Sequence, residues 1–276
     1  MYIVGIGDNV VDRYLARGQM FPGGNALNVA VFARRAGAQT AYVGALGTDR
    51  AGRQVLRALQ EEGVDVSRVR IVPGPNAYAE VNLVDGDRQF VGSSLGVSMF
   101  TPDAGDLAMA RAADLVHSST YSGLDEWVQA QREELAISFD FSDRIGQTYV
   151  EAIGPGLVSA QFSGAALDDQ TAEDLARWTV SLGTRLVLVT RGAKSAIACM
   201  GDRCYTQQPR PVLPVDTLGA GDAFIAAFLV AHLEGADVPE AMARAADAAA
   251  ATCGYFGGFG HAGPIEDRTA NAQEAV

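Results

Sequence analysis

The stretch Asp216-Thr217-Leu218-Gly219-Ala220-Gly221-Asp222 places small residues and a carboxylate at the start of an apolar segment that reaches Gly235. The segment predicts a buried helix, in which Asp222 is the only carboxylate before Glu234. Free N–H groups at a helix N-terminus bind anions, and glycines let a backbone come close to a ligand. These residue types suit phosphoryl transfer, with the amides of Gly219, Ala220 and Gly221 as an anion site and Asp222 as a catalytic residue. The alternative is that Asp222 only caps the helix.

A second candidate site is the stretch Phe21-Pro22-Gly23-Gly24-Asn25-Ala26-Leu27-Asn28. Gly23 and Gly24 open the loop to close approach, Asn25 can cap the following helix, and Asn28 lies one turn later on the same side. A side-chain amide both donates and accepts hydrogen bonds, which suits sugar hydroxyls. A capped helix with an incidental asparagine explains Asn25 well and Asn28 poorly.

Asp8 and Asp12 follow the first apolar run, where an α/β sheet usually binds its ligand. The run Gly5-Ile6-Gly7-Asp8 begins like a dinucleotide fingerprint, but the third glycine is missing, so we exclude a nicotinamide site. Gly192-Ala193-Lys194-Ser195 lacks the spacing of a P-loop. Paired carboxylates accept hydrogen bonds from vicinal hydroxyls, which favours a polyol. For Asp8, a role in a turn is an equal alternative.

Alternating strands and helices must position these residues. Short apolar runs predict parallel strands covered on both faces, at Tyr2–Ile6, Ala41–Val43, Asp114–Ser118, Ile137–Phe141, Val158–Phe162 and Leu186–Thr190. Periodic segments closed by glycines predict helices at Asn25–Ala36, Arg50–Glu62, Asp168–Leu182 and from Pro239 to Gly254. The alternation predicts a wound α/β fold with a mainly parallel central sheet.

One segment interrupts the alternation. Tyr78–Val84 and Arg88–Gly92 read as strands joined by the turn Asp85-Gly86-Asp87. Tyr78, Glu80 and Asn82 give the first strand a polar face. Such a hairpin could cover a polar ligand, and a solvent-exposed hairpin or a dimer contact is an equal alternative.

Composition limits the function classes. The 276 residues, 48% of them hydrophobic, predict one domain over residues 1–276, with a mobile tail at 265–276. A net charge of −12 opposes binding to nucleic acid and to acidic membranes. Without a signal peptide or a membrane-spanning run, the protein is expected in the cytoplasm. The three cysteines and three histidines indicate neither a disulfide framework nor a zinc site.

Both glycine-containing stretches together resemble the ribokinase/PfkB carbohydrate kinases, over nearly the whole chain. The resemblance implies a three-layer α/β/α sandwich with a small β lid near 12–20 and 76–94. It implies ATP and Mg²⁺, Asp222 as the base, the amides of Gly219 to Asp222 as the anion hole, and substrate contacts from Asp12, Gly24 and Asn28. A monovalent cation is a further candidate ligand, which the sequence leaves open. Three stretches look most like fructoselysine 6-kinases: Ile6–Asp12, Phe21–Ala30 and Phe139–Asp143.

The chain also departs from the family pattern. Many relatives carry Asn-x-x-Glu near the metal, where this chain reads Ser163-Gly164-Ala165-Ala166, followed by Asp168 and Asp169. We therefore assign no metal ligands. Thr190-Arg191-Gly192 is similar to a strand end that lies near the nucleotide in the family, and the expected nucleotide-binding residues are Thr190, Gly192, Asp216, Thr217, Gly219 and Gly221. Asp140 and Arg144 are further site candidates, from an element similar to Asp-x-Asn-x-Arg.

The expected function is transfer of the γ-phosphoryl of ATP to a primary hydroxyl of a sugar, with an Amadori sugar such as fructoselysine as the acceptor. Substrate contacts are expected from Asp8, Asp12, Gly23, Gly24, Asn28, Glu80 and Arg88. Glu80 would face the amine of the acceptor, and Arg88 its carboxylate. Alternatives are a fructokinase, a ribokinase, a nucleoside kinase, or a non-catalytic sugar or nucleotide sensor, which would not need Asp222. A homodimer through the lid is expected, and no nucleic-acid or membrane partner.

Overall fold

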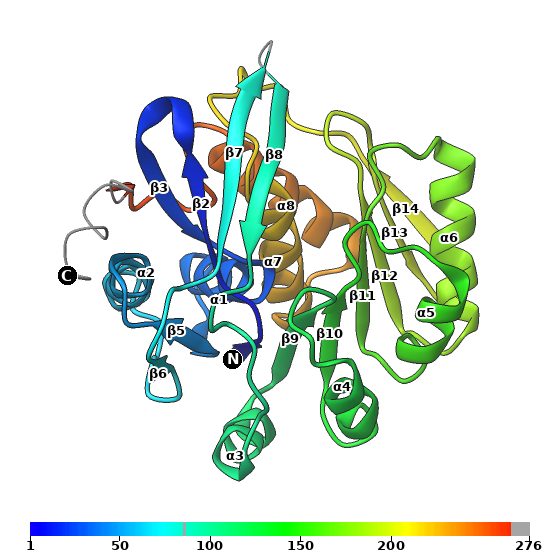
Figure 1. The fold of residues 1–276 in the computed structure, drawn as a ribbon. Helices are drawn as coiled ribbons and strands as arrows, with labels where there is room; N and C mark the ends of the chain where they lie inside the picture. The colour runs from blue at the N-terminus through cyan, green and yellow to red at the C-terminus, as the bar shows by residue number, and fades with distance from the viewer. Residues whose placement is uncertain (85–86, 266–276) are drawn as a thin grey trace, which may run out of the picture.

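The computed structural model describes residues 1–84 and 87–265, except for the side chains of 82–90. The described residues form an eight-stranded central sheet in the order β14-β13-β12-β11-β10-β9-β1-β4 (Figure 1). Its strands are β1 (Tyr2–Ile6), β4 (Gln39–Val43), β9 (Leu115–Ser119), β10 (Ile137–Asp140), β11 (Ser159–Ser163), β12 (Leu186–Thr190), β13 (Ala196–Met200) and β14 (Arg203–Gln207). The strands from β12 to β4 run parallel, and β13 and β14 continue the sheet antiparallel. The mainly parallel sheet is confirmed, and each of the six strands expected from apolar runs is present, with ends shifted by at most two residues.

Helices cover both faces of this sheet, which confirms the three-layer sandwich. They are α1 (Asn25–Arg35), α2 (Arg50–Glu61), α3 (Ala104–Ala112), α4 (Asp125–Gln131), α5 (Gln147–Ile153), α6 (Asp169–Ser181), α7 (Ala220–Leu233) and α8 (Val238–Thr252). Side chains from α1, α2, α7 and α8 form one buried cluster with residues such as Ile3. Side chains from α3 to α6 form a second cluster with residues such as Val4. Successive strand residues thus enter opposite cores, because side chains alternate along a strand.

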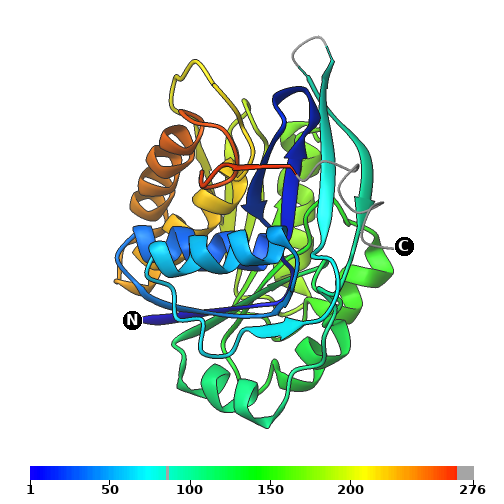
Figure 2. The ribbon, with the colours of Figure 1, turned by 60° about the vertical axis from the view of Figure 1, so that its left-hand side comes forward.

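A smaller five-stranded sheet, ordered β15-β3-β2-β7-β8, forms what we call the lid sheet. It contains β2 (Val10–Tyr14), β3 (Gln19–Gly23), β7 (Tyr78–Val84), β8 (Asp87–Ser94) and β15 (Gly263–Pro264). Strands β2, β3, β7 and β8 stand together at one end of the molecule in Figures 1 and 2. The remaining strands, β5 (Ala45–Gly47) and β6 (Arg70–Val72), pair with each other, and a 3₁₀ helix spans Leu15–Arg17. The two strands of the expected hairpin are confirmed, while Asp85 and Gly86 lie outside the described residues.

The two faces of the lid sheet carry different residues. Asp12 pairs with Phe21 and Ala79, whereas Arg13 pairs with Met20 and Glu80. Directly paired residues share a face, and neighbours along a strand point to opposite faces. Asp12 and Tyr14 therefore lie on one face, which we call the inner face, and Arg13 and Glu80 lie on the outer face.

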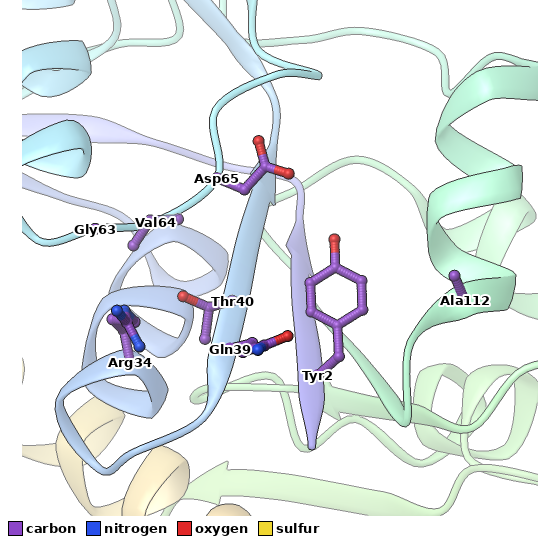
Figure 3. Close-up of a pocket in the computed structure, with 8 residues that line it drawn as sticks. All are labelled: Tyr2, Arg34, Gln39, Thr40, Gly63, Val64, Asp65 and Ala112. Atoms are coloured by element: carbon purple, nitrogen blue, oxygen red, sulfur yellow. The ribbon is translucent and has the colours of Figure 1, made fainter.

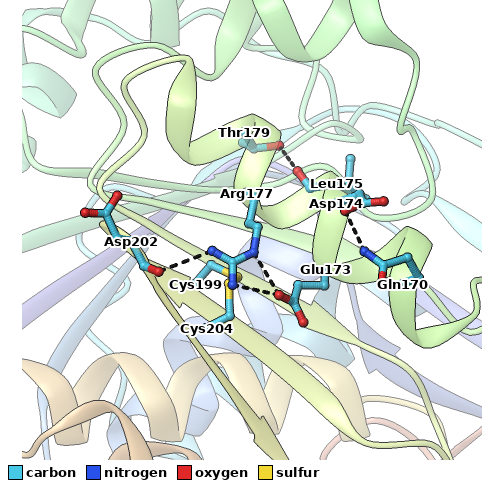
Figure 4. Close-up of a disulfide and its surroundings, with 9 residues drawn as sticks. All are labelled: Gln170, Glu173, Asp174, Leu175, Arg177, Thr179, Cys199, Asp202 and Cys204. Carbon is cyan, nitrogen blue, oxygen red and sulfur yellow. Dashed lines mark hydrogen bonds and ion pairs between the residues drawn. A yellow bond between two sulfur atoms is a disulfide. The ribbon is translucent and has the colours of Figure 1, made fainter.

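One sequence expectation is wrong: Cys199 and Cys204 form a disulfide between β13 and β14 (Figure 4). The hairpin register sets the two residues directly opposite each other, a proximity that their spacing of five residues did not reveal. Cys253 is buried as a free thiol. Within the described residues, no helix is long and apolar enough to span a membrane. Of the tail expected to be mobile, 265–276, all but Ile265 lie outside the described residues.

Candidate active site

The N-terminus of α7 is open. Gly219 precedes the helix with a φ of 74°, a left-handed conformation that favours glycine. A Cβ there would also lie only 2.7 Å from the Cα of Gly258, so the close backbone approach needs glycine as well. In the described part of the chain, no side chain forms a capping hydrogen bond with this helix. The first α-helical bond runs from Ala223 N to the Gly219 carbonyl at 2.8 Å, and the N–H groups of Gly221 and Asp222 have no acceptor among the described residues. Unpaired amides of this kind attract an anion.

Asp222 faces the second candidate site. Its Oδ2 accepts a hydrogen bond from Nδ2 of Asn28 at 2.7 Å, which joins two stretches 194 residues apart. Asp222 lies in the first turn of α7, where a carboxylate is favourable through the helix dipole, but among the described residues its side chain bonds Asn28 and not the helix backbone. Asn28 is 4% exposed, and its Oδ1 has no hydrogen-bond partner among the described residues. A buried amide oxygen without a donor points to a missing hydroxyl or N–H group.

The electrostatics of this pair favour a carboxyl group that takes up protons readily. Asp222 is half-buried, and the reduced hydration of its carboxyl group raises its pKa well above the ordinary value. The hydrogen bond from Asn28 opposes this shift, while the negative charges of Asp140, Asp8 and Asp12 raise the pKa further. A raised pKa brings a carboxyl group closer to the range in which it can exchange protons near neutral pH.

Asp8 anchors the first turn of α1. Its carboxylate accepts from the backbone N–H groups of Asn25 at 2.7 Å and Ala26 at 3.2 Å. The hydroxyls of Ser119 and Ser122 donate to the same carboxylate at 2.8 and 2.9 Å. These four bonds use most of the acceptor capacity of a carboxylate. The structure therefore supports a role for Asp8 in holding the turn into α1 more than the expected contact with substrate.

Asp12 and the two glycines lie beside this turn. Asp12 is 5% exposed on the inner face of the lid sheet. A Cβ at Gly23 would lie 2.6 Å from Oδ2 of Asp12, so any larger residue would displace that carboxylate from its present position. Gly24 has a φ of 113°, and a Cβ there would lie 2.6 Å from the Cα of Asn9. Both glycines thus let β3 pass closely into α1, which brings Asp12 and Asn28 to the same end of the helix.

Asp140 is a second buried carboxylate at the site, after Asp12. It ends β10, is 3% exposed, and accepts from Nδ2 of Asn25 at 2.5 Å and from the Ser142 N–H at 2.7 Å. Burial raises the pKa of Asp140 to about 6. The side chain of Asn25 thus donates to Asp140, and the backbone N–H of Asn25 donates to Asp8. One turn later, the side chain of Asn28 donates to Asp222.

The carboxylate of Asp216 accepts hydrogen bonds from other groups of the protein. It accepts from the hydroxyl of Tyr14 at 2.5 Å and from the backbone N–H groups of Leu218 and Gly257, each at 3.0 Å. Asp216 is 7% exposed, and the neighbouring Thr217 is exposed. Asp216 therefore shapes the turn that leads into α7, while its expected contact with the nucleotide stays a prediction.

Thr190 and Gly192 lie at the end of β12, close to the open amides. The hydroxyl of Thr190 lies 3.9 Å from the Cβ position of Gly221, and Gly192 has a φ of 61° beside open space. Arg191 between them is buried and forms an ion pair with Asp169 at 2.7 Å. Asp168 caps α6 through the N–H of Thr171. Within the described part of the chain, no group of three His, Cys, Asp or Glu side chains is arranged to hold a metal.

The expected role of Glu80 needs correction. Glu80 lies on the outer face of the lid sheet, where it faces Arg13 at 3.8 Å, and Asp12 lies on the opposite face. The guanidinium of Arg13 also lies 3.8 Å from the ring centre of Tyr78. Because side chains alternate along a strand, Glu80 points away from Asp222. The sequence alone could not show this, because it does not reveal which residue of β7 pairs with Asp12. Arg88 belongs to β8, but its side chain lies outside the described part.

A wide crevice elsewhere is not part of this site. It encloses about 770 Å³ between Tyr2, Arg34, Thr40 and Asp65 (Figure 3). These residues lie beside the amino ends of β1 and β4, whereas Asp8 and Asp140 follow or end their strands. Ligands of open α/β sheets bind at the carboxyl ends. The crevice therefore does not compete with the Asp222 region as the active site.

Sequence reasoning missed three groups at the site: Tyr14, the serines that hold Asp8, and the segment after α8. Gly257 donates to Asp216, and Gly258 lies against both Gly219 and the side chain of Asn28. The run Gly254-Tyr255-Phe256-Gly257-Gly258-Phe259-Gly260 was a signal for close backbone approach. Nothing in the sequence connected Tyr14 with Asp216, which lies 202 residues away.

Known proteins resemble this chain along most of its length. The model of the pfkB family carbohydrate kinases matches residues 2–142 and 159–260. A fructosamine kinase of Bacillus subtilis is 38% identical over 97% of this chain and 96% of its own. A fructoselysine 6-kinase of Escherichia coli is 36% identical, covering 92% of this chain and 98% of its own. A fructokinase of Klebsiella pneumoniae is 29% identical, covering 90% of each chain.

Solved structures show the same fold. A ribokinase from Arabidopsis thaliana, complexed with ribose and ATP, superimposes with a TM-score of 0.79 at 24% identity, covering 94% of each chain. An uncharacterized sugar kinase from Pyrococcus horikoshii gives a TM-score of 0.78 at 21% identity, also covering 94% of each chain. These likenesses confirm the expected ribokinase-like architecture.

Proposed function

The chain belongs to the pfkB family of carbohydrate kinases and is an ATP-dependent sugar kinase, for which we propose a fructosamine such as fructoselysine as the acceptor and Asp222 as the base. The observation that carries the proposed site is the contact between Asn28 and Asp222 beside the open N-terminus of α7. It sets a sugar-binding amide, a carboxyl group with a raised pKa and an anion site next to one another. A sensor without catalysis has no use for this arrangement.

In the proposed mechanism, Asn28 and Asp12 hold hydroxyl groups of the sugar, and the unpartnered Oδ1 of Asn28 accepts from one of them. The Asp222 carboxylate takes the proton from the primary hydroxyl of the sugar. The oxygen of that hydroxyl attacks the γ-phosphorus of ATP in line with the departing ADP. The N–H groups of Gly221 and Asp222 stabilise charge on the transferring oxygens. The inner face of the lid sheet excludes water, which would otherwise compete with the sugar.

Magnesium is proposed as the companion of ATP. Mg²⁺ usually keeps several waters and is bound by substrate phosphates with one or two carboxylates, so a three-carboxylate cage is not required. It would neutralise charge on those phosphates. Asp168 and Asp169, which follow the expected metal position in sequence, already cap α6 and pair with Arg191. We therefore assign no protein ligand to the ion. A monovalent cation stays a prediction.

The choice of a fructosamine is supported by the relatives at 36% and 38% identity, which act on fructoselysine or fructosamine by name. A fructosamine carries an amine and, beyond it, the charged groups of an amino acid. Because Glu80 faces away, we propose a different contact surface for this arm, made of Tyr121, Asp143 and Arg144. Tyr121 is 43% exposed, its hydroxyl donates to Asp143 at 3.2 Å, and the Arg144 guanidinium lies 5.7 Å from its ring centre.

The position of this surface supports the proposal. Tyr121 follows Ser119, whose hydroxyl donates to Asp8, and the Tyr121 N–H bonds back to the same hydroxyl at 3.2 Å. Asp143 follows the buried Asp140 in the loop after β10. The surface thus begins where β9 and β10 deliver their residues to the sugar site. Arg144 can bind a carboxylate, Asp143 an ammonium group, and the Tyr121 ring an alkyl chain.

The test is an assay of ADP release with fructoselysine, other fructosyl amino acids, fructose, ribose, 2-keto-3-deoxygluconate and adenosine. We expect the highest kcat/KM with a fructosyl amino acid, and nuclear magnetic resonance of the product should locate the phosphate on O6. A higher kcat/KM with fructose would favour the fructokinase alternative, for which 29% identity to a fructokinase is the supporting observation. The proposed homodimer through the lid is checked separately by light scattering.

A further inference from the structure

A buried hydrogen bond joins the lid sheet to the turn before α7. The hydroxyl of Tyr14 donates to Oδ2 of Asp216 at 2.5 Å, and the two residues are 2% and 7% exposed. Tyr14 belongs to β2, and Asp216 opens the turn that leads to the α7 amides. A bond between a hydroxyl and a buried carboxylate is stronger than one between neutral groups.

The same carboxylate organises the surrounding backbone. Asp216 accepts from the N–H of Leu218 in its own turn and from Gly257 in the segment after α8. Gly258 packs against Gly219 and against the amide of Asn28. A displacement of Asp216 would therefore reach the residue that precedes α7 and the residue that holds Asp222.

On the other side, Tyr14 lies two residues from Asp12 on the same face of β2, so both side chains approach the site from the lid. The Tyr14 ring meets Phe21 edge-on at 5.2 Å and Phe256 at 6.4 Å. These apolar contacts hold the ring, while the hydroxyl alone reaches Asp216. The packing and the hydrogen bond can therefore be separated by removing one oxygen atom.

We propose that Tyr14 is a positioning residue that sets the lid strand carrying Asp12 in register with the turn carrying the α7 amides and Asp222. The inference rests on the proposed roles of those groups. Its consequence is that closure of the lid over the sugar and alignment of the phosphoryl-binding turn are one coupled event. Without the bond, each half can bind its own substrate, but the acceptor hydroxyl and the γ-phosphorus are aligned less often and water enters more easily.

The test compares Tyr14→Phe with Tyr149→Phe. Tyr149 is the control, because its hydroxyl also bonds an aspartate, Asp125, at 3.1 Å, together with the Thr120 hydroxyl at 2.9 Å, but on α5 and away from the lid sheet. For Tyr14→Phe we expect kcat to fall about 10- to 100-fold, as for a misaligned reacting pair, with KM for ATP changed less than about threefold. The ratio of ADP formed to sugar phosphate formed should rise above one. Tyr149→Phe should keep kcat and the ratio of ADP to sugar phosphate within about twofold of wild type.

Asp216→Asn provides a second variant that changes the acceptor instead of the donor, and it serves if Tyr14→Phe does not fold. We expect the same loss of coupling, and the double variant should lose less than the product of the two single effects, because both remove one interaction. Thermal unfolding of every variant separates loss of fold from loss of alignment. A Tyr14→Phe enzyme with wild-type kcat and an ADP to sugar phosphate ratio of one would overturn the inference, and so would fully multiplicative effects. If Asp222→Asn keeps full activity, the proposed function fails instead.

Discussion

Two helix N-termini face the same site and are used in opposite ways. At α1, the carboxylate of Asp8 takes the N–H groups of Asn25 and Ala26. At α7, no side chain among the described residues caps the helix, and the residue before it is Gly219. Both ends carry the same partial positive charge from their amides. The protein neutralises that charge at α1 with its own carboxylate and leaves it available at α7.

The difference shows how one fold separates the site of the phosphoryl acceptor, the sugar, from the site of the phosphoryl donor, ATP. A capped α1 repels a phosphate but presents the side-chain amides of Asn25 and Asn28, which suit neutral hydroxyl groups. An open α7 attracts a phosphate and carries Asp222 in its first turn. The Asn28–Asp222 bond at 2.7 Å fixes the two ends against each other. The comparison predicts that changes at α7 damage catalysis first and changes at α1 damage stability first.

The largest effect is expected from Asp222→Asn. Because the amide cannot accept the hydroxyl proton, the rate should fall by about 10²–10⁴-fold, while ATP affinity, measured by calorimetry, changes little. In the wild type, kcat/KM should also fall as the pH is lowered through the raised pKa of Asp222, since the protonated form is not a base.

Asn28→Asp is the matched control for Asp222→Asn, because it changes the other side of the same contact and leaves the base in place. It should raise KM for the sugar and shift the acid limb of the pH profile upward, because a second negative charge favours protonation of Asp222. Near-wild-type turnover by Asp222→Asn would remove this carboxylate from the mechanism.

Gly221→Val tests the open end of α7 itself. The side chain would project near Thr190, where the γ-phosphoryl oxygens are proposed to approach the amides. We expect kcat to fall by about 10²-fold, comparable to the loss of one oxyanion donor, with a smaller effect on thermal unfolding. Gly146→Val is the control, because Gly146 is exposed, has a φ of −60° that valine can adopt, and lies next to open space. If unfolding dominates at Gly221, its role is packing.

Asp8→Ala tests the capped end. The variant leaves the Asn25 and Ala26 amides without their acceptor and the Ser119 and Ser122 hydroxyls without theirs, so the free energy of unfolding should fall by about 2 kcal/mol. Activity should fall through a higher KM for the sugar, since Asn28 loses its fixed position. Asp237→Ala, which removes the cap of α8, should destabilise the protein by about 1 kcal/mol without that change in KM. An unchanged KM in Asp8→Ala would separate the cap from substrate binding.

The smallest effect concerns the arm of the acceptor. Arg144→Ala should lower kcat/KM for fructoselysine roughly fivefold, which corresponds to about 1 kcal/mol, because exposed ion pairs contribute little. The kcat/KM for fructose should not change. Glu80→Gln removes a charge on the outer face of the lid sheet and should leave both values unchanged. The reverse result, with Glu80 controlling the preference, would restore the sequence expectation and would require the outer face to contact the substrate.

The sequence by itself determined the layers and the chemistry of the two glycine stretches. Apolar runs gave the six parallel strands, because strands buried on both faces need continuous apolar residues. Gly219 and Asp222 were recognisable because a carboxylate after small residues at the start of an apolar helix has few structural uses. The hairpin 78–94 was recognisable from turn residues between two alternating runs.

The tertiary structure alone decided which partners these residues meet. Asp8 looked equally suited to a sugar or a turn, and only the packing of β9 beside β1 brought Ser119 to its carboxylate. Strand pairing sent Glu80 to the outer face, and a two-strand register joined Cys199 to Cys204. The bonds from Tyr14 to Asp216 and from Asn28 to Asp222 span about two hundred residues. Local patterns carry no signal for such pairs, because their proximity arises only when the sheet order brings distant segments together.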